Sequence, residues 1–197
     1  HVHSRGILHR DISSKNVLLR RSNLSDRRVH VIADFGMACT IPSPHGLSNE
    51  YHLCQAVCAI TTRAPEVLFG GKHRWHEGQW RPGALCVYGA PADVYSLGAV
   101  ILEASLGRPW CWKPDQTEKE FAGALALRLG AMPTHLSRRL CLKTLPDQRT
   151  HGPWVQWQAT GALARGGTLA RALRKVVTWD PKTRPSASEL CLTCLDM

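Results

Sequence analysis

Side chains that can bind cations or carry protons occur in short frames along this 197-residue chain. The stretch HRDISSKN contains Asp11 and Asn16, and Asp34 follows at the end of an apolar run. Carboxylate and amide oxygens are the ligands that Mg²⁺ takes in proteins, and a carboxylate can also accept a proton. Each frame alone is a weak signal, but five of them follow one another in one order. They are His9-Arg10-Asp11 with Asn16, Asp34-Phe35-Gly36, Ala64-Pro65-Glu66, Asp93 at the start of an apolar helix, and Arg184 in DPKTRPSA.

In this order the motifs resemble the large, C-terminal lobe of a eukaryotic protein kinase, over essentially the whole chain, residues 1–197. The resemblance implies a catalytic loop at 9–16, an activation segment at 34–66, and transfer of the γ-phosphate of ATP to serine or threonine of a protein substrate, with Mg²⁺. A Gly-rich loop and a V-A-I-K lysine do not occur in the sequence. We therefore expect the N-terminal kinase lobe to be a missing partner and the chain alone to be inactive.

The resemblance also gives roles to residues of the catalytic frames. Asp11 would orient the substrate hydroxyl and accept its proton. Asn16 and Asp34 would bind Mg²⁺ next to the phosphates of ATP. The floor of the adenine pocket would be formed by Leu18 and Ala33.

A second set of residues is structural or regulatory by the same resemblance. Glu66 would form a buried ion pair with Arg184, and Asp93 would hold the backbone of the catalytic loop. Arg10 would receive a phosphate on the activation segment. Gly36 would give the backbone conformational freedom next to the metal-binding aspartate.

The sequence departs from the kinase pattern at positions that bear on activity. Ser13 stands where serine/threonine kinases carry a lysine, and Lys15 would partly replace that charge. Ala59 stands where a Thr or Ser normally bonds to the catalytic loop, and Cys54 where cyclin-dependent kinases carry a phosphothreonine. A catalytically weak or inactive kinase-like scaffold is therefore the alternative. Regulatory phosphorylation is expected within the activation segment, at Ser43, Ser48, Tyr51, Thr61 or Thr62.

Three segments resemble the CMGC group, which includes cyclin-dependent, mitogen-activated and glycogen-synthase kinases. They are TTRAPEVLFG, GRPWCWKPDQTEKEF and LRLGAMPT. The 91 positions from Asp93 to Arg184 (184 − 93) leave room for the helical insert of that group, expected at about 131–167. By this resemblance Arg63 would shape a pocket that favours proline after the target residue, and an activating protein subunit is a further expected partner.

Hydrophobic periodicity predicts a mainly α domain with one small β-hairpin. The hairpin is expected from NVLLRR and VHVIADF, which flank the turn-rich SNLSD. A helix is expected over PADVYSLGAVILEASLG, with Asp93 as its N-cap, Val94, Leu97, Ile101 and Ala104 at helical spacing, and Gly107 at its end. Long loops are expected at 36–63, 71–91 and 131–167. Further helices are expected over TEKEFAGALALRLG, with Thr117 and Glu120 in capping-box spacing, over TLARALRKVVTW and over ASELCLTCL.

Composition restricts the partners. The net charge of +10 favours acidic partners such as nucleotide phosphates, and a basic nucleic-acid-binding module is a further alternative, although the basic residues are dispersed. No apolar run reaches the ~18 residues of a membrane span. Eight cysteines at irregular positions indicate reduced thiols in a cytoplasmic or nuclear protein. Zinc ligation by Cys191 with Cys194, His73 with His76, or Cys54 with Cys58 is weighed against ordinary cysteines and histidines, which we favour.

Overall fold

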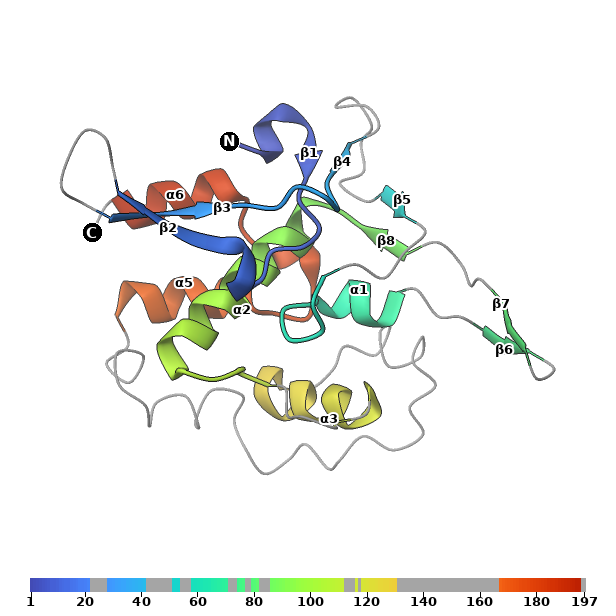
Figure 1. Ribbon diagram of the computed structural model, residues 1–197. Helices are drawn as coiled ribbons and strands as arrows, with labels where there is room; N and C mark the ends of the chain where they lie inside the picture. The colour runs from blue at the N-terminus through green and yellow to red at the C-terminus, as the bar shows by residue number, and fades with distance from the viewer. Residues whose placement is uncertain are drawn as a thin grey trace.

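The computed structural model describes residues 1–21, 28–41, 51–53, 58–70, 74–76, 79–81, 86–111, 116, 118–130 and 167–195. Figure 1 shows these elements, with one long helix, α2, crossing the middle of the molecule. The described elements are, in chain order, η1 (His3–Arg5), β1 (Ile7–Leu8), η2 (Ser14–Asn16), β2 (Val17–Arg21), β3 (Arg28–Ile32), β4 (Cys39–Thr40), β5 (Tyr51–Leu53), α1 (Pro65–Gly70), β6 (Arg74–His76), β7 (Gln79–Arg81), β8 (Cys86–Tyr88), α2 (Ala90–Leu106), α3 (Glu118–Leu129), α5 (Thr168–Val176), η6 (Pro181–Thr183) and α6 (Ala187–Leu195).

The predicted β-hairpin is present. Strands β2 and β3 pair antiparallel, with Val17 opposite Ile32 and Arg21 opposite Arg28. The SNLSD turn between them lies outside the described residues. The hairpin connects two segments of the candidate site: η2 with Asn16 precedes β2, and Ala33-Asp34 follows β3.

Three further strand pairs correct the expectation of loops at 36–63 and 71–91. Strand β4 pairs with β1, β5 with β8, and β6 with β7, all antiparallel. These strands have only two or three residues each, which is too short for an alternating pattern to be recognised in the sequence. The β1–β4 pair matters for the site, since it fixes the chain just before the catalytic loop next to the chain just after Gly36.

Helix α2 forms the centre of the core, and its N-cap is not the predicted residue. The helix begins at Ala90 with Gly89 as N-cap, so Asp93 lies in the first turn and is not the cap. Its carboxylate is used elsewhere, by distant backbone N–H groups. The predicted end is confirmed, because Gly107 follows the helix in the left-handed conformation (φ 65°) that favours glycine. The helix is buried around most of its circumference, although Ala104 is exposed.

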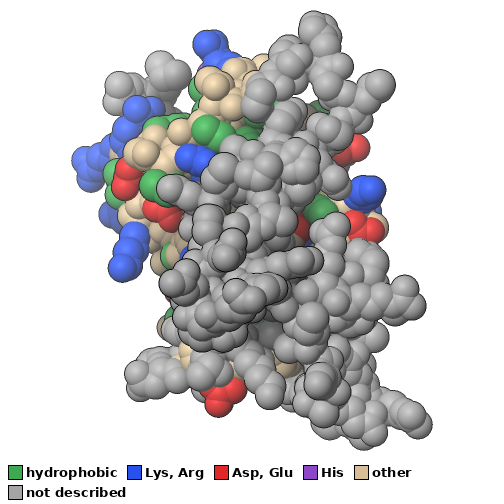
Figure 2. All heavy atoms as spheres, turned by 90° about the vertical axis from the view of Figure 1, so that its right-hand side faces the viewer, with side chains coloured by type: hydrophobic (Ala, Val, Ile, Leu, Met, Phe, Trp, Pro, Cys, Tyr) green, Lys and Arg blue, Asp and Glu red, His purple; other side chains and the backbone are tan. Residues whose placement is uncertain are grey.

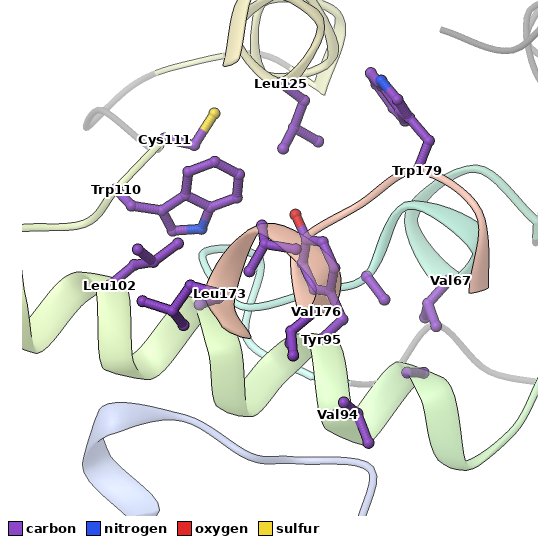
Figure 3. Packing of buried hydrophobic residues seen from close by; sticks show 14 of the residues in the cluster. Val67, Val94, Tyr95, Leu102, Trp110, Cys111, Leu125, Leu173, Val176 and Trp179 are labelled. Atoms are coloured by element: carbon purple, nitrogen blue, oxygen red, sulfur yellow. The ribbon is translucent and has the colours of Figure 1, made fainter. Parts of the chain in front are cut away.

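Helix α5 packs directly on α2. A Cβ atom placed on Gly98 would lie 2.5 Å from Cγ1 of Val176 and 2.8 Å from Cγ2 of Val177, so only glycine allows this close approach. Figure 3 shows the surrounding core, with Tyr95 and Leu102 of α2 facing Leu173 and Val176 of α5.

The remaining predicted helices are present as α3, α5 and α6. The Trp179 indole N–H donates to the Gly130 carbonyl at 3.1 Å, which ties the end of α3 to the segment after α5. Trp110, Cys111 and Leu125 complete the core cluster on that side (Figure 3). Thr117 of the predicted capping box and the expected insert at 131–166 lie outside the described residues.

Surface features bear on the alternatives of the sequence. Figure 2 shows Lys and Arg side chains along one edge of the face it presents, with acidic side chains next to some of them. Within the described ranges, no helix combines the length and apolarity of a membrane span, and no group of three or more His, Cys, Asp and Glu side chains could hold a metal ion. Cys39, Cys58, Cys111 and Cys191 are free thiols in this part of the chain.

Candidate active site

The backbone of the catalytic loop is held by the buried carboxylate of Asp93. One carboxylate oxygen, Oδ2, accepts the His9 N–H at 2.7 Å, and the other, Oδ1, accepts the Arg10 N–H at 2.9 Å. His3 Nε2 lies 2.9 Å from Oδ2 as well. Hydrogen bonds to a carboxylate are stronger than neutral ones. The central helix therefore fixes the loop two residues before Asp11, as the resemblance implied.

His9 links the catalytic loop to the end of β3 in one tautomer. The Asp11 N–H donates to Nδ1 at 3.3 Å, so Nδ1 is the acceptor and the ring proton is on Nε2. Nε2 then donates to the Ala33 carbonyl at 3.1 Å. The ring is almost fully buried and packs edge-on against Phe35, with centroids 4.7 Å apart. His9 therefore holds the chain before Asp34 close to the chain before Asp11.

Asp11 and Asn16 are in direct contact. The Asn16 amide Nδ2 donates to the Asp11 carbonyl at 2.8 Å and to its carboxylate Oδ2 at 3.0 Å. Because Nδ2 faces Asp11, Oδ1 is the amide oxygen that can bind a cation. The turn is closed by the Asn16 N–H, which donates to the Ser13 carbonyl at 3.0 Å.

Asp34 stands next to this pair. The Ala33 N–H donates to the Asn16 carbonyl at 2.8 Å, and the next residue, Asp34, has an exposed side chain. Its Oδ1 accepts the Gly36 N–H at 3.1 Å. A Cβ atom on Gly36 would also lie 3.1 Å from Oδ1, so a side chain at position 36 would crowd this carboxylate.

These oxygens fit a magnesium site that is completed by a ligand. Mg²⁺ is usually bound by one or two protein oxygens together with water and substrate phosphates, not by an all-protein cage. Asn16 and Asp34 offer such a pair of oxygens at one edge of the domain. Leu18 and Ala33, the predicted adenine floor, lie on or beside the same hairpin; Leu18 is 51% exposed and Ala33 is half-buried.

Backbone strain is concentrated around the site. Three non-glycine residues in the described ranges have positive φ: Arg10 (66°), Asp34 (63°) and Cys58 (72°). Left-handed backbone at such residues costs about 1–3 kcal/mol each and tends to occur at functional sites. Two of the three flank or form the predicted catalytic frames, and the third belongs to the segment that packs on them.

Cys58, Arg63 and Ser96 connect the end of the activation segment to the loop and to α2. The Cys58 sulfur lies 2.9 Å from the Arg10 carbonyl oxygen. Both Nε and Nη2 of Arg63 donate to the Cys58 carbonyl, at 3.3 and 2.9 Å. The Ser96 hydroxyl lies 2.9 Å from the Thr62 carbonyl oxygen and 3.0 Å from that of Ala92.

The predicted ion pair between Glu66 and Arg184 is present and bidentate. Nη1 lies 2.6 Å from Oε1 and Nη2 lies 2.8 Å from Oε2. The guanidinium also donates to the carbonyls of Pro91 and Thr178, at 3.0 and 2.9 Å, and stacks over the Tyr95 ring. It thus joins the start of α1, the start of α2 and the segment after α5.

The other predicted residues differ in exposure and in their partners. The Lys15 side chain is exposed, whereas Ser13 is only 6% exposed. The Arg10 side chain donates from Nε to the Met37 carbonyl. Thr62 is 1% exposed, so phosphorylation there would require local opening. Ser43, Ser48 and Cys54 lie outside the described residues.

Several contacting residues were not expected from the sequence. His3, Cys58 and Ser96 all touch the catalytic loop or its supports. His3 precedes the loop in HSRGILHRD, and this position is the one signal in the sequence that could have pointed to it. Cys58 and Ser96 carry no local signal, because their partners lie 48 and 34 positions away.

Comparison with solved structures supports the fold. The chain is similar to a chain in the structure of the CAK complex from Chaetomium thermophilum bound to ATP-γ-S, with a TM-score of 0.65 and 24% identity. The similarity covers 96% of this chain and 52% of the other.

Curated relatives are protein kinases of more than one kind. Serine/threonine-protein kinase PLK4 of Drosophila melanogaster is 31% identical over 159 residues, which are 76% of this chain and 17% of PLK4. KIN28 of Saccharomyces cerevisiae is 34% identical over 110 residues, 56% of this chain and 28% of that protein. A probable serine/threonine-protein kinase of Arabidopsis thaliana is 36% identical over 120 residues, 61% of this chain and 17% of that protein. The chain therefore spans well under two thirds of these relatives.

The family model described as protein kinase domain matches residues 1–193. That range contains every motif discussed above. The chain belongs to the protein kinase family.

Proposed function

We propose that this chain is the C-terminal lobe of a CMGC-like serine/threonine kinase that transfers the γ-phosphate of ATP to proteins. The observation that carries the proposal is the contact between Asp11 and Asn16, with Asp34 held next to them through Ala33. A proton acceptor and two cation-binding oxygens thus share one edge of the domain. Phosphoryl transfer depends on such alignment and charge neutralisation more than on covalent participation by the protein.

Each of these residues has its own role in the proposed transfer. Asp11 orients the substrate hydroxyl and accepts its proton. Its position is maintained by the Asn16 amide on one side and by the Asp93-bound backbone on the other. Asn16 and Asp34 would hold Mg²⁺, which when bound with ATP would supply the positive charge that balances the phosphates.

Apolar side chains around the hairpin support the assignment to one lobe. Leu18 is 51% exposed, Leu19 53% and Phe35 47%, which is unusual for residues of this size in neighbouring segments. Since consecutive strand residues point to opposite faces, a small lobe packed on one face of the hairpin would cover either Leu18 or Leu19, and it would supply the missing half of the ATP site. The similar chain of the CAK complex is about twice as long, since 96% of this chain corresponds to 52% of it.

Arg63 supports a preference for proline after the phosphorylated residue. Two guanidinium donors occupy the Cys58 carbonyl, which Cys58 presents from a left-handed backbone. The Cys58 carbonyl is then not free to accept the backbone N–H of the substrate residue that follows the target. A buried N–H without an acceptor costs about 1–3 kcal/mol. Proline has no N–H and avoids the penalty.

The alternative, a catalytically weak or inactive scaffold, is favoured by the region of Ser13. The serine is 6% exposed and has no positive charge to replace the lysine expected of an efficient kinase, so that only the exposed Lys15 nearby would replace the charge in part. Loss of one such electrostatic contact commonly lowers the rate by ~10²–10³. The frame residues that accept the proton and bind the metal are nevertheless retained.

The test is γ-phosphate transfer by the full-length protein. Substrates are paired peptides with Ser-Pro or Ser-Ala at the target site. We expect transfer that falls to background in Asp11→Asn and rises in Ser13→Lys, with Ser-Pro favoured over Ser-Ala and the preference reduced in Arg63→Ala. Wild-type transfer equal to that of Asp11→Asn would favour the scaffold. Equal phosphorylation of the two peptides would contradict the proline preference but not the kinase activity.

A further inference from the structure

A side chain of the activation segment reaches the backbone of the catalytic loop. The Cys58 sulfur lies 2.9 Å from the carbonyl oxygen of Arg10, 48 positions earlier in the chain. The adjacent position, Ala59, where the kinase resemblance predicts a hydroxyl that bonds to the catalytic loop, has an exposed side chain without a donor. Cys58 therefore makes a connection of the kind that Ala59 cannot make.

The peptide group that Cys58 contacts is the one that leads into Asp11. Its carbonyl end, on Arg10, receives the thiol, and its N–H end, on Asp11, donates to Nδ1 of His9 at 3.3 Å. The preceding peptide N–H, that of Arg10, is bound by Asp93. With both ends of the Arg10–Asp11 peptide bonded, its plane cannot rotate freely, although Arg10 has a strained φ of 66°.

The sulfur keeps the proton that this role requires. Two causes raise the pKa of the Cys58 thiol to about 12. Burial is the larger cause, and the negative charge of the nearby Asp93 carboxylate is the next. The group is therefore a neutral S–H donor at neutral pH, not a thiolate that would repel a carbonyl oxygen. The Cys58 carbonyl serves a separate partner, because it receives the Arg63 guanidinium.

We propose that Cys58 is a positioning residue for Asp11: its thiol donates a hydrogen bond to the Arg10 carbonyl and so fixes the peptide plane from which the Asp11 side chain extends. This inference rests on the proposed kinase function. It connects the conformation of the activation segment to the alignment of the proton acceptor through one hydrogen bond.

The kinetic test compares four variants of the full-length protein. Cys58→Ala removes the donor, Cys58→Ser keeps a donor, and Cys58→Gly removes the donor while relieving the left-handed backbone. Cys191→Ala, on the exposed face of α6, is the control. We expect kcat to fall about five- to tenfold in the Ala and Gly variants, while KM for ATP stays within twofold of the wild-type value. In Cys58→Ser, kcat should return to at least about half of the wild-type value. Cys191→Ala should match the wild type.

Amide hydrogen exchange supplies a readout that does not depend on activity. Peptides covering residues 8–12 should exchange about five- to tenfold faster in Cys58→Ala and regain protection in Cys58→Ser, while peptides from α2 stay unchanged. Unchanged kcat and exchange in Cys58→Ala would overturn the proposal. So would a Cys58→Ser variant that behaves like Cys58→Ala, or a Cys58→Gly variant with full kcat, since the backbone alone would then account for the residue. If the wild type transferred no phosphate, the kinase function would fail and the exchange data would still decide the positioning role.

Discussion

Arg184 and Glu66 lie 118 positions apart and form a buried ion pair with two parallel hydrogen bonds of 2.6 and 2.8 Å. The pair lies between the start of α1 and the last helices, and the Arg184 guanidinium also donates to the carbonyls of Pro91, at the start of α2, and of Thr178, after α5. It therefore fastens the end of the activation segment to the C-terminal part of the core.

Truncation of either partner should be strongly destabilising, because the other charge is left buried and unpaired. We expect Glu66→Ala and Arg184→Ala each to lower the free energy of unfolding by about 3–5 kcal/mol, measured by urea denaturation. The double variant should lose much less than the sum of the two, since no unpaired charge remains. Additive losses would show that the two side chains are not coupled.

Gly98 is a position where α2 closely approaches the end of α5. Gly98→Ala should lower the free energy of unfolding by about 1–3 kcal/mol despite the better helix propensity of alanine, because the new Cβ would overlap Val176 and Val177. Gly167→Ala, where a Cβ meets nothing within 4 Å, is a control for added volume, and it should cost about 1 kcal/mol or less, through the lower N-cap preference of alanine at the start of α5. In the Val176→Ala background, Gly98→Ala should be clearly less destabilising, and an unchanged cost there would contradict the steric explanation.

The thiols should differ widely in reactivity in the native protein. Burial raises the pKa of both Cys58 and Cys111 to about 12; Cys111 is buried and Cys58 is half-buried, whereas Cys191 is exposed. At about pH 8 we expect iodoacetamide to label Cys191 first, with Cys58 and Cys111 labelled only on unfolding, as followed by mass spectrometry. Early labelling of Cys58 would mean that its segment opens readily. The raised pKa values also predict that the contribution of these thiols to stability is complete below about pH 9, the unfolded value, and is lost as the pH rises toward 12.

Helix α6 begins with a capping box that should be detectable by titration. The Glu189 carboxylate accepts the Ser186 N–H at 2.7 Å, and the Ser186 hydroxyl accepts the Glu189 N–H at 3.2 Å. The backbone hydrogen bond lowers the pKa of Glu189 below its ordinary value of 4.5. Its stabilising effect is therefore present above about pH 4.5 and is lost as the pH falls through the lower, folded value.

Carbon-detected NMR can follow this titration directly. Ser186→Gly retains the backbone N–H and loses only the smaller effect of the Ser186 side chain, so the pKa of Glu189 should rise only in part, whereas Ser186→Pro removes that N–H as well and should return the pKa toward the ordinary value. A Glu189 pKa that is the same in both variants would exclude the backbone bond as the cause.

The sequence predicted the site better than it predicted the chain that supports it. The frames around Asp11, Asn16 and Asp34 are short and local, and their order along the chain made the family resemblance specific. The β2–β3 hairpin and the helices followed from periodicity, which also acts locally. The Glu66–Arg184 pair came from the resemblance, because nothing near either residue in sequence indicates its partner.

The features that escaped prediction depend on distant partners or very short elements. For Asp93 the local pattern misled, because it predicted an N-cap, whereas only the resemblance predicted the bonds from backbone N–H groups 83 and 84 positions away that the carboxylate accepts. The strands β5 and β8 have three residues each and pair across a long stretch of chain. The Cys58 bond depends on a left-handed backbone that no local pattern marks.

The attachment of the catalytic loop to α2 has a consequence for the order of folding. Residues 9–16 are synthesised before Asp93, but their backbone is fixed only when a loop of more than 80 residues has closed (|i−j| of 83 and 84). Closing such a loop carries an entropic cost that local helix formation does not. A nascent chain can therefore form its helices locally, whereas both the attachment of the catalytic loop and the α2–α5 core, which joins Gly98 to Val176 (176 − 98 = 78 positions), wait for long-range closure.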